Sequence, residues 1–423
     1  MPTWTAEVFQ NEYLPDGATD VHAIVTVTSA GTGHAGDVGG AAEAIIIDCS
    51  GSMGAPQAKI VAARKAAAAA INEIADGTWF AVIAGVGLAE PVYPPSGMVQ
   101  ADQGTRAAAS EAVSRLTPRG GTAIGQWLMT AQEAFARTPA TQRHAILLTD
   151  GKNEGESAAQ LQAEVQAVTG EFQCDCRGVG ADWDVAELRG IATALLGSVD
   201  LIADPADMAA DFQAMMQTAM GRGVADAKLR VWAPQGAELL FVRQVAPTID
   251  DLTDRRTNVT PLITEYPTGA WGDESRDYHV AVRVAAKPVG AEQLAARVQI
   301  EVGGEVVTQG LVKALWSDDS ALTTRINPAV AHYTGQAELA QVIQEGLAAK
   351  ADGDEDTATF KLGRAAKLAA ETGNEEATQR LKKVVDITDA DTGTVRLKRD
   401  ASKLDEMALD TSSTKTTRVR PSS

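Results

Sequence analysis

The fold is set by residues 44–52, where an uninterrupted apolar run gives way to an acidic, hydroxyl-bearing loop. These residues read Ala-Ile-Ile-Ile-Asp-Cys-Ser-Gly-Ser. Consecutive apolar residues without polar alternation are typical of a strand buried on both faces of a parallel sheet. Asp48, Ser50 and Ser52 follow at once, and alternation places both hydroxyls on one side of the loop. The stretch therefore predicts a central buried strand that ends in a polar loop.

Short apolar strands and helical stretches continue to alternate through residues 43–221. Strands are predicted at 79–84, 145–148, 172–179 and 199–202, and helices at 60–74, 106–116, 124–135, 157–168, 185–194 and 206–220. Strands separated by helices of this length imply βαβ units. The predicted fold class is therefore α/β, with a doubly wound, mainly parallel sheet of the Rossmann-like kind over residues 41–221.

The regions that flank this domain alternate with period two, which indicates antiparallel strands. Residues 222–320 contain several such stretches, among them Tyr278, Val280 and Val282, and predict a β-sandwich. Residues 3–29 hold two further strands, which would be marginal by themselves. We therefore expect the strands of residues 1–40 to join the sandwich, with the α/β domain inserted between its parts. The glycine-rich stretch at 32–40 is predicted to be a linker.

The C-terminal part of the chain is predicted to be helical over residues 328–386. Gly373 suits the end of one helix, and Asn374, followed by two glutamates, suits the start of the next. Residues 387–423 show no sustained periodicity and end in a threonine-rich polar stretch, which predicts a disordered tail.

Composition limits the classes of function. The chain has 423 residues and a net charge of −19, which opposes nucleic-acid binding. It contains no run of about 18 apolar residues, so no membrane span is expected. Residues 1–7 show neither the basic nor the apolar region of a signal peptide, so none is expected, and the cysteine count is odd. Both observations predict a cytoplasmic location. Cys174 and Cys176 share one face of a strand, where buried packing is favoured over metal binding.

Two more polar residues lie at other strand–helix junctions. Thr122 stands at the head of a predicted helix, and Asp150 ends a predicted strand. Ligands bind at the carboxyl ends of strands in open α/β sheets. Mg²⁺ prefers about six oxygen ligands, and Asp48, Ser50, Ser52, Thr122 and Asp150 all offer oxygen. The sequence therefore predicts a Mg²⁺ site, which would also suit Mn²⁺.

Asp48-x-Ser50-x-Ser52, Thr122 and Asp150-Gly151 together resemble the metal-ion-dependent adhesion site of von Willebrand factor A domains. The resemblance covers about residues 41–221. It implies that the two serines ligate the metal directly, that the aspartates act mainly through water, and that the threonine ligates in one conformational state. It also implies that the sixth position accepts an acidic group of a protein partner, without catalysis.

The alternative function is a Mg²⁺-dependent phosphoester hydrolase with Asp48 as the nucleophile. Haloacid-dehalogenase phosphatases use Asp-x-Asp after a strand, but Ser50 replaces the second aspartate here and cannot serve as a general acid. The five histidines are scattered, and no phosphate-binding Gly-x-x-x-x-Gly-Lys loop is present. The pattern therefore favours a binding protein over an enzyme.

The threonine-rich tail suggests a second hypothesis. Thr416 is followed three residues later by Val419, which resembles the phosphothreonine ligands of forkhead-associated domains. The whole arrangement is similar to that of bacterial A-domain proteins of phospho-signalling settings, so a Ser/Thr kinase and a forkhead-associated protein are candidate partners. The alternative is a tail that only improves solubility.

Overall fold

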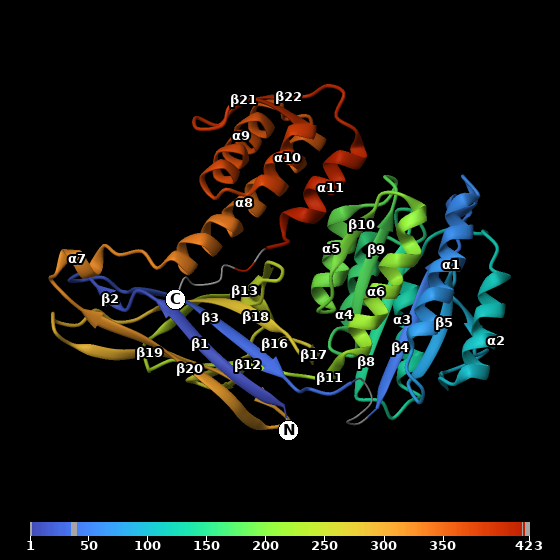
Figure 1. The fold of residues 1–423 in the computed structure, drawn as a ribbon, viewed down its shortest axis with the longest axis horizontal. Helices are drawn as coiled ribbons and strands as arrows, with labels where there is room; N and C mark the ends of the chain where they lie inside the picture. The colour runs from blue at the N-terminus through green and yellow to red at the C-terminus, as the bar shows by residue number, and fades with distance from the viewer. Residues whose placement is uncertain (1, 35–39, 417, 419–423) are drawn as a thin grey trace. The chain divides into compact units, whose positions relative to one another are not determined.

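The computed structural model describes residues 2–34, 40–416 and 418 (Figure 1). Outside this description lie part of the predicted linker, residues 35–39, and part of the predicted tail, residues 417 and 419–423. The chain divides into two compact units. The first contains Met1–Gly31, Asp226–Thr268 and Asp273–Ser423, and the second contains Thr32–Ala225 and Gly269–Gly272. The α/β unit is thus inserted, in sequence, between parts of the first.

The α/β unit is built on β4 (Ala41–Asp48), every residue of which is buried. β4 pairs in parallel with β5 and β8, and the sheet order is β10-β9-β8-β4-β5-β6. The other strands are β5 (Trp79–Gly85), β6 (Glu90–Tyr93), β7 (Val99–Gln100), β8 (Gln142–Thr149), β9 (Gln173–Val179) and β10 (Val199–Ile202). β6 and β7, which the sequence analysis missed, pair antiparallel with β5. The predicted mainly parallel sheet is confirmed.

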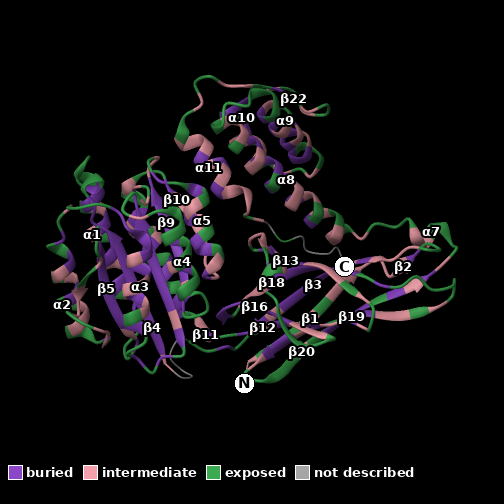
Figure 2. Cartoon of the chain, turned by 180° about the vertical axis from the view of Figure 1, so that it is seen from behind, coloured by how far each residue is buried: buried purple, intermediate pink, exposed green. Residues whose placement is uncertain are grey.

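Helices lie on both faces of this sheet, and its central strands β4, β5 and β9 are coloured mostly as buried in Figure 2. Ile45 and Ile47 pack in one hydrophobic cluster with residues of α1 (Ala58–Glu73), α2 (Gln103–Ser114) and α6 (Met208–Met220). On the other face, α3 (Ile124–Phe135) lies on β4 and β5 and packs against α4 (Ala158–Val168), which in turn contacts α5 (Val185–Ala194). The doubly wound arrangement holds the carboxyl ends of β4 and β8 side by side.

The first unit contains the predicted sandwich of mainly antiparallel sheets. One sheet has the order β1-β3-β18-β13-β14 and the other β15-β16-β12-β19-β20-β2. β3 pairs along its length with both β1 and β18, so the N-terminal strands complete the first sheet. The strands are β1 (Thr3–Gln10), β2 (Tyr13–Leu14), β3 (Asp20–Ala30), β12 (Lys228–Trp232), β13 (Glu238–Ala246), β14 (Asp250–Asp251), β15 (Thr257–Thr260), β16 (Ile263–Pro267), β18 (Ser275–Arg283), β19 (Glu292–Val302) and β20 (Glu305–Trp316).

The remaining helices belong to the same first unit. They are the short α7 (Ser320–Thr323), then α8 (Pro328–Ala351), α9 (Glu355–Glu371), α10 (Glu375–Val384) and α11 (Lys403–Ser413). Asn374 caps α10 as predicted, because its side chain accepts from the amide of Ala377. None of the described helices is long and apolar enough to cross a membrane.

The expected disordered tail from residue 387 is wrong for residues 387–413. A hairpin of β21 (Val385–Asp389) and β22 (Thr394–Leu397) and the helix α11 occupy this stretch. Val395 and Leu409 enter the hydrophobic cluster of α8, α9 and α10. Isolated apolar residues of this kind make no periodic pattern, but packing against the preceding helices buries them. Tertiary contacts therefore order a segment whose local signals are weak.

Candidate metal site at the carboxyl edge of the sheet

The predicted site residues come from several segments that meet at one edge of the α/β sheet. Asp48 ends β4, and Asp150 follows β8 directly. β4 and β8 are parallel neighbours with Ile47 opposite Leu148, so their polar ends lie side by side. Ser50 and Ser52 lie at the start of the short 3-10 helix η1 (Gly51–Gly54), and Thr122 precedes α3.

Asp48 is fully buried and held by two protein donors. The Ser50 amide donates to its Oδ1 at 2.7 Å, and the Thr149 hydroxyl donates to its Oδ2 at 2.6 Å. Burial raises the pKa of Asp48, these hydrogen bonds lower it, and the neighbouring Asp150 raises it. A cation beside this carboxylate would favour its ionised form, which burial alone opposes.

The two serine hydroxyls converge as the alternation predicts. Ser50 Oγ and Ser52 Oγ are 2.9 Å apart, and Ser52 Oγ donates to Asp150 Oδ1 at 2.6 Å. Two backbone bonds fasten this loop to the segment before Thr122: Gly51 N to Gly120 O at 3.1 Å, and Arg119 N to Cys49 O at 2.7 Å. The Asp-x-Ser-x-Ser loop and the threonine segment are therefore joined through their main chains.

Thr122 lies at the same place, although it is remote in sequence. Its carbonyl accepts from the Gly155 amide at 2.7 Å, and its side chain is buried. A Cβ atom placed on Gly151 would lie 3.5 Å from Ser52 Oγ and 3.6 Å from Thr122 Oγ1. A side chain at residue 151 would thus begin beside both hydroxyls, so glycine keeps the space between them open.

Lys59 and Thr149 are members of this cluster that the sequence analysis missed. Lys59 lies in the first turn of α1, is only 8% exposed, and places Nζ 2.6 Å from Asp150 Oδ2. Its Nζ is also 3.9 Å from Asp182, whose side chain is largely exposed. A buried lysine needs an anionic partner. The sequence signal was a lone cation at the start of an Ala-rich helix, seven residues after Ser52.

The assembled groups fit a hard dication. Two fully buried carboxylates lie within hydrogen-bond reach of clustered hydroxyls, and Asp150 Oδ1 already accepts from Ser52. Mg²⁺ prefers such oxygen donors and keeps several of its waters. Ser50, Ser52 and Thr122 would offer direct oxygen ligands, and Asp48 and Asp150 would accept hydrogen bonds from metal-bound water.

The cysteines lie in buried surroundings. Cys49 is 1% exposed within the cluster that also contains Met53, and burial raises the pKa of its thiol to about 12. Cys174 and Cys176 are buried and free. Among the described residues, no group of three or more His, Cys, Asp or Glu side chains is placed to hold a metal.

Thr416 belongs to the first unit, whereas the predicted metal-site residues belong to the second. Its amide donates to Pro247 O at 3.0 Å, and its hydroxyl donates to Val245 O at 2.5 Å. Two residues on, the Arg418 guanidinium pairs with the buried Asp277 at 2.8 Å. Val419, the other half of the predicted recognition motif, lies outside the described residues. Thr416 is therefore docked on the end of β13, not held in a free tail.

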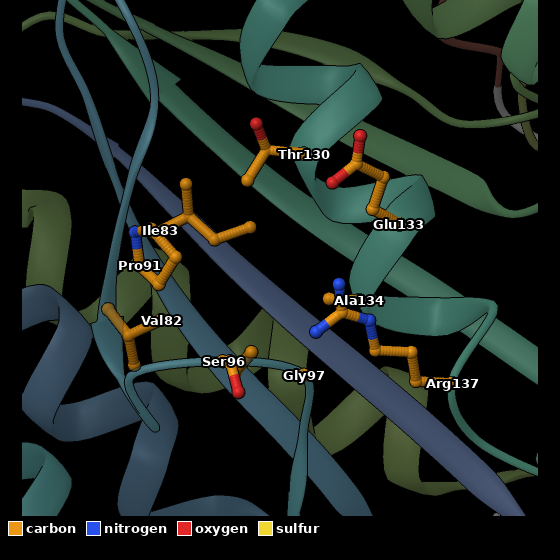
Figure 3. A pocket seen from close by; sticks show the side chains of 10 residues that line it. Val82, Ile83, Pro91, Ser96, Gly97, Thr130, Glu133, Ala134 and Arg137 are labelled. Carbon is orange, nitrogen blue, oxygen red and sulfur yellow. The ribbon is translucent and has the colours of Figure 1, made fainter.

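A pocket of 120 Å³ lies elsewhere in the α/β unit, between β5, β6 and α3 (Figure 3). Val82 and Pro91 line it from the strands, and Thr130, Glu133 and Arg137 line it from α3. It includes none of the predicted metal-site residues, so it is separate from the carboxyl edge.

A doubly wound sheet with these hydroxyl and carboxyl groups at its carboxyl edge defines a type A domain. The model of the von Willebrand factor type A domain matches residues 44–200, and the model of the type A C-terminal domain matches residues 367–413. The chain belongs to the von Willebrand factor type A family. Domains of this family bind protein ligands, typically through a divalent metal at the adhesion site, and are usually not catalytic.

Solved structures support the assignment over the whole chain. A von Willebrand factor type A protein from Catenulispora acidiphila is 48% identical, with a TM-score of 0.93, and the match covers 99% of this chain and 98% of that one. The ArnB paralogue VWA2 from Sulfolobus acidocaldarius is 16% identical with a TM-score of 0.57 and 98% coverage of both chains, which shows a shared fold. No curated protein matched the sequence.

Proposed function

We propose that this protein is a non-catalytic interaction protein that binds an acidic group of a protein partner through Mg²⁺ at the carboxyl edge of its α/β sheet. The observation that carries the proposal is the cluster of Ser50 and Ser52 hydroxyls with the buried Asp48 and Asp150 carboxylates. Because the ligands that would contact the metal directly are neutral hydroxyls, no anionic protein group would lie in its inner coordination shell. The metal would then keep affinity for a carboxylate from outside.

Calorimetric titration with Mg²⁺ tests the metal site directly. We expect binding by the unmodified chain and none by the Asp48→Ala, Ser50→Ala double variant. The control variant is Asp102→Ala with Thr105→Ala, which removes a carboxylate and a hydroxyl from the capping box of α2. Equal Mg²⁺ binding by the site variant and by the unmodified chain would refute the proposal. Mn²⁺ should bind to the same residues.

The partner is tested by affinity capture with and without Mg²⁺, comparing the unmodified chain with Asp48→Ala. We expect a captured protein that is lost in both the metal-free sample and the variant.

The hydrolase alternative predicts turnover of phosphoesters that depends on Asp48. We expect no turnover while metal binding is intact, because Asp48 accepts hydrogen bonds on both oxygens and none of the donors is a general base.

Regulation through Thr416 is the finer part of the proposal. Phosphate on this hydroxyl would remove its bond to Val245 O and add charge of about −1.5 to −2 near a main-chain carbonyl. The phosphorylated segment would then leave β13 and become available to a forkhead-associated domain. Mass spectrometry after incubation with a bacterial Ser/Thr kinase tests this, and absence of phosphate on residues 411–417 contradicts it.

A cytoplasmic location completes the proposal. It is supported by Cys49, Cys174 and Cys176, all of which are buried as free thiols. Fractionation of the producing cell tests it, and recovery of the protein outside the cytoplasm would contradict it.

A further inference from the structure

Lys59 is the charged group of the carboxyl edge that the adhesion-site motif does not include. Its Nζ lies 2.6 Å from Asp150 Oδ2, on the oxygen opposite the one that accepts from Ser52. Asp150 is fully buried, and Lys59 is 8% exposed. The side chain is therefore an internal cation fixed at the edge of the proposed metal site, not a surface charge that solvent screens.

The formal charge of the site depends on this residue. Among the buried groups, Asp48 and Asp150 contribute −2 and Lys59 contributes +1, so these three sum to −1. Asp182, 3.9 Å from Nζ, is largely exposed, and solvent screens its charge. Addition of a dication brings the site to +1, whereas without Lys59 the same addition gives zero. Because these groups are buried, a unit of charge changes the affinity for any further ion strongly.

We propose that Lys59 strengthens the mutual dependence of metal binding and acidic-partner binding, which a metal bridge to the partner already creates in weaker form. Its charge weakens the affinity of the site for Mg²⁺ alone, and it leaves the metal-loaded site positive, which strengthens the affinity for an anion. The partner's carboxylate then stabilises the bound metal, and the metal stabilises the bound partner, as reciprocal linkage requires. This inference rests on the proposed function, since it presumes a metal at the same edge.

A purely structural role for Lys59 makes a different prediction. If the lysine only neutralised Asp150 to stabilise the fold, its loss would lower stability, and the acetate affinity of the metal-loaded site would not fall while Mg²⁺ affinity rises. The proposed role moves them in opposite directions: Mg²⁺ binds more tightly and the anion binds more weakly. The sign of the two changes therefore separates the two roles.

The test compares Lys59→Met, which keeps much of the side-chain length, with the unmodified chain. Calorimetry measures the dissociation constant of Mg²⁺, and acetate serves as the anionic probe. Acetate binding to the Mn²⁺-loaded protein is followed by water-proton relaxation, which falls as acetate displaces metal-bound water. We expect Mg²⁺ to bind at least about tenfold more tightly and acetate at least about tenfold more weakly.

Three further variants make the test decisive. Lys59→Gln removes the charge but keeps a donor toward Asp150, and it should repeat the result if Lys59→Met does not fold. Lys59→Arg keeps the charge and should change both affinities little. Lys65→Met removes an exposed lysine from the same helix and should change neither.

The outcomes separate this inference from the proposed function. If the unmodified chain does not bind Mg²⁺, the proposed function fails, and this inference fails with it. If the unmodified chain binds Mg²⁺ but loss of the Lys59 charge leaves the Mg²⁺ affinity unchanged, or shifts both affinities in one direction, only this inference is overturned.

Discussion

The two edges of the α/β sheet carry buried charge in different ways, although the same strands supply both. At the carboxyl edge, β4 ends in Asp48, and β8 leads into Asp150. At the opposite edge, β4 carries Glu43 and β8 carries His144, which are paired in register. All four side chains are buried. The contrast lies in what neutralises the carboxylates.

At the amino ends of the strands, which we call the amino edge, the buried carboxylates are neutralised by a neighbouring side chain of the protein. His144 Nδ1 lies 2.7 Å from Glu43 Oε2, and Nε2 lies 2.9 Å from Asp175 on β9. Burial lowers the pKa of His144, but the two carboxylates outweigh burial and raise it to about 9. Burial raises the pKa of Asp175, yet His144 and nearby arginines hold it well below its usual range. An imidazolium thus bridges two carboxylates with both of its N–H groups.

The carboxyl edge instead has hydroxyl donors and a single lysine. Ser52 and Lys59 hold opposite oxygens of Asp150, and Ser50 and Thr149 hold Asp48. Hydroxyl oxygens can turn from donating to ligating a metal, whereas the N–H groups of an imidazolium cannot. The comparison teaches that the same strands can stabilise the fold at one edge and keep a ligand site available at the other.

The largest expected effect comes from His144→Ala at the amino edge. Removal of the imidazolium leaves Glu43 and Asp175 buried without their shared partner, which should cost about 3–5 kcal/mol in the free energy of unfolding. Urea denaturation measures it. Arg143→Ala, on the same strand but with a half-exposed ion pair to Glu171, should cost less than about 1 kcal/mol. A cost for His144→Ala as small as that of the control would break the comparison.

The pH dependence of stability should report the same edge. The pKa of His144 is raised from 6.5 to about 9 in the folded chain, so its contribution is complete below pH 6.5 and is lost as pH rises through 9. One pKa unit corresponds to about 1.4 kcal/mol, so the decline should reach about 3 kcal/mol. Urea denaturation at pH 6 to 10 measures it. A decline of the same size in a His144 variant would show that other groups cause it.

The smallest expected effect on stability lies in a matched pair of substitutions at the carboxyl edge. Thr149→Val removes a buried hydroxyl that donates to the Asp48 carboxylate and should cost about 1.5–3 kcal/mol. Thr122→Val removes a hydroxyl proposed to ligate the metal and should cost less than about 1 kcal/mol without metal. Thermal unfolding without metal measures both. Equal costs would mean that Thr122 serves the fold rather than the ligand.

Much of the α/β unit followed from local pattern. The run at 44–47 gave a strand buried on both faces, and the helix at Ile124–Phe135 was predicted at its observed bounds. Apolar residues spaced 3.6 apart, or in a continuous run, predict these elements correctly. The reason is that the folded sheet and its helices bury the same faces that the pattern marks as apolar. The hairpin at 385–397 and α11 carry too few apolar residues for such a signal, and they were missed.

In the candidate site, too, some residues could be predicted from the sequence and others could not. The residue types of Asp48, Ser50, Ser52, Thr122 and Asp150, and their places at strand ends, were readable in the sequence because parallel strands bring their carboxyl ends together. Lys59 and Thr149 could not be predicted as members of the site, because no local sequence pattern indicates which lysine or threonine contacts a carboxylate. Only the tertiary structure decided those partners, because burial beside a charge depends on which surfaces pack together, and that information is spread over the whole chain.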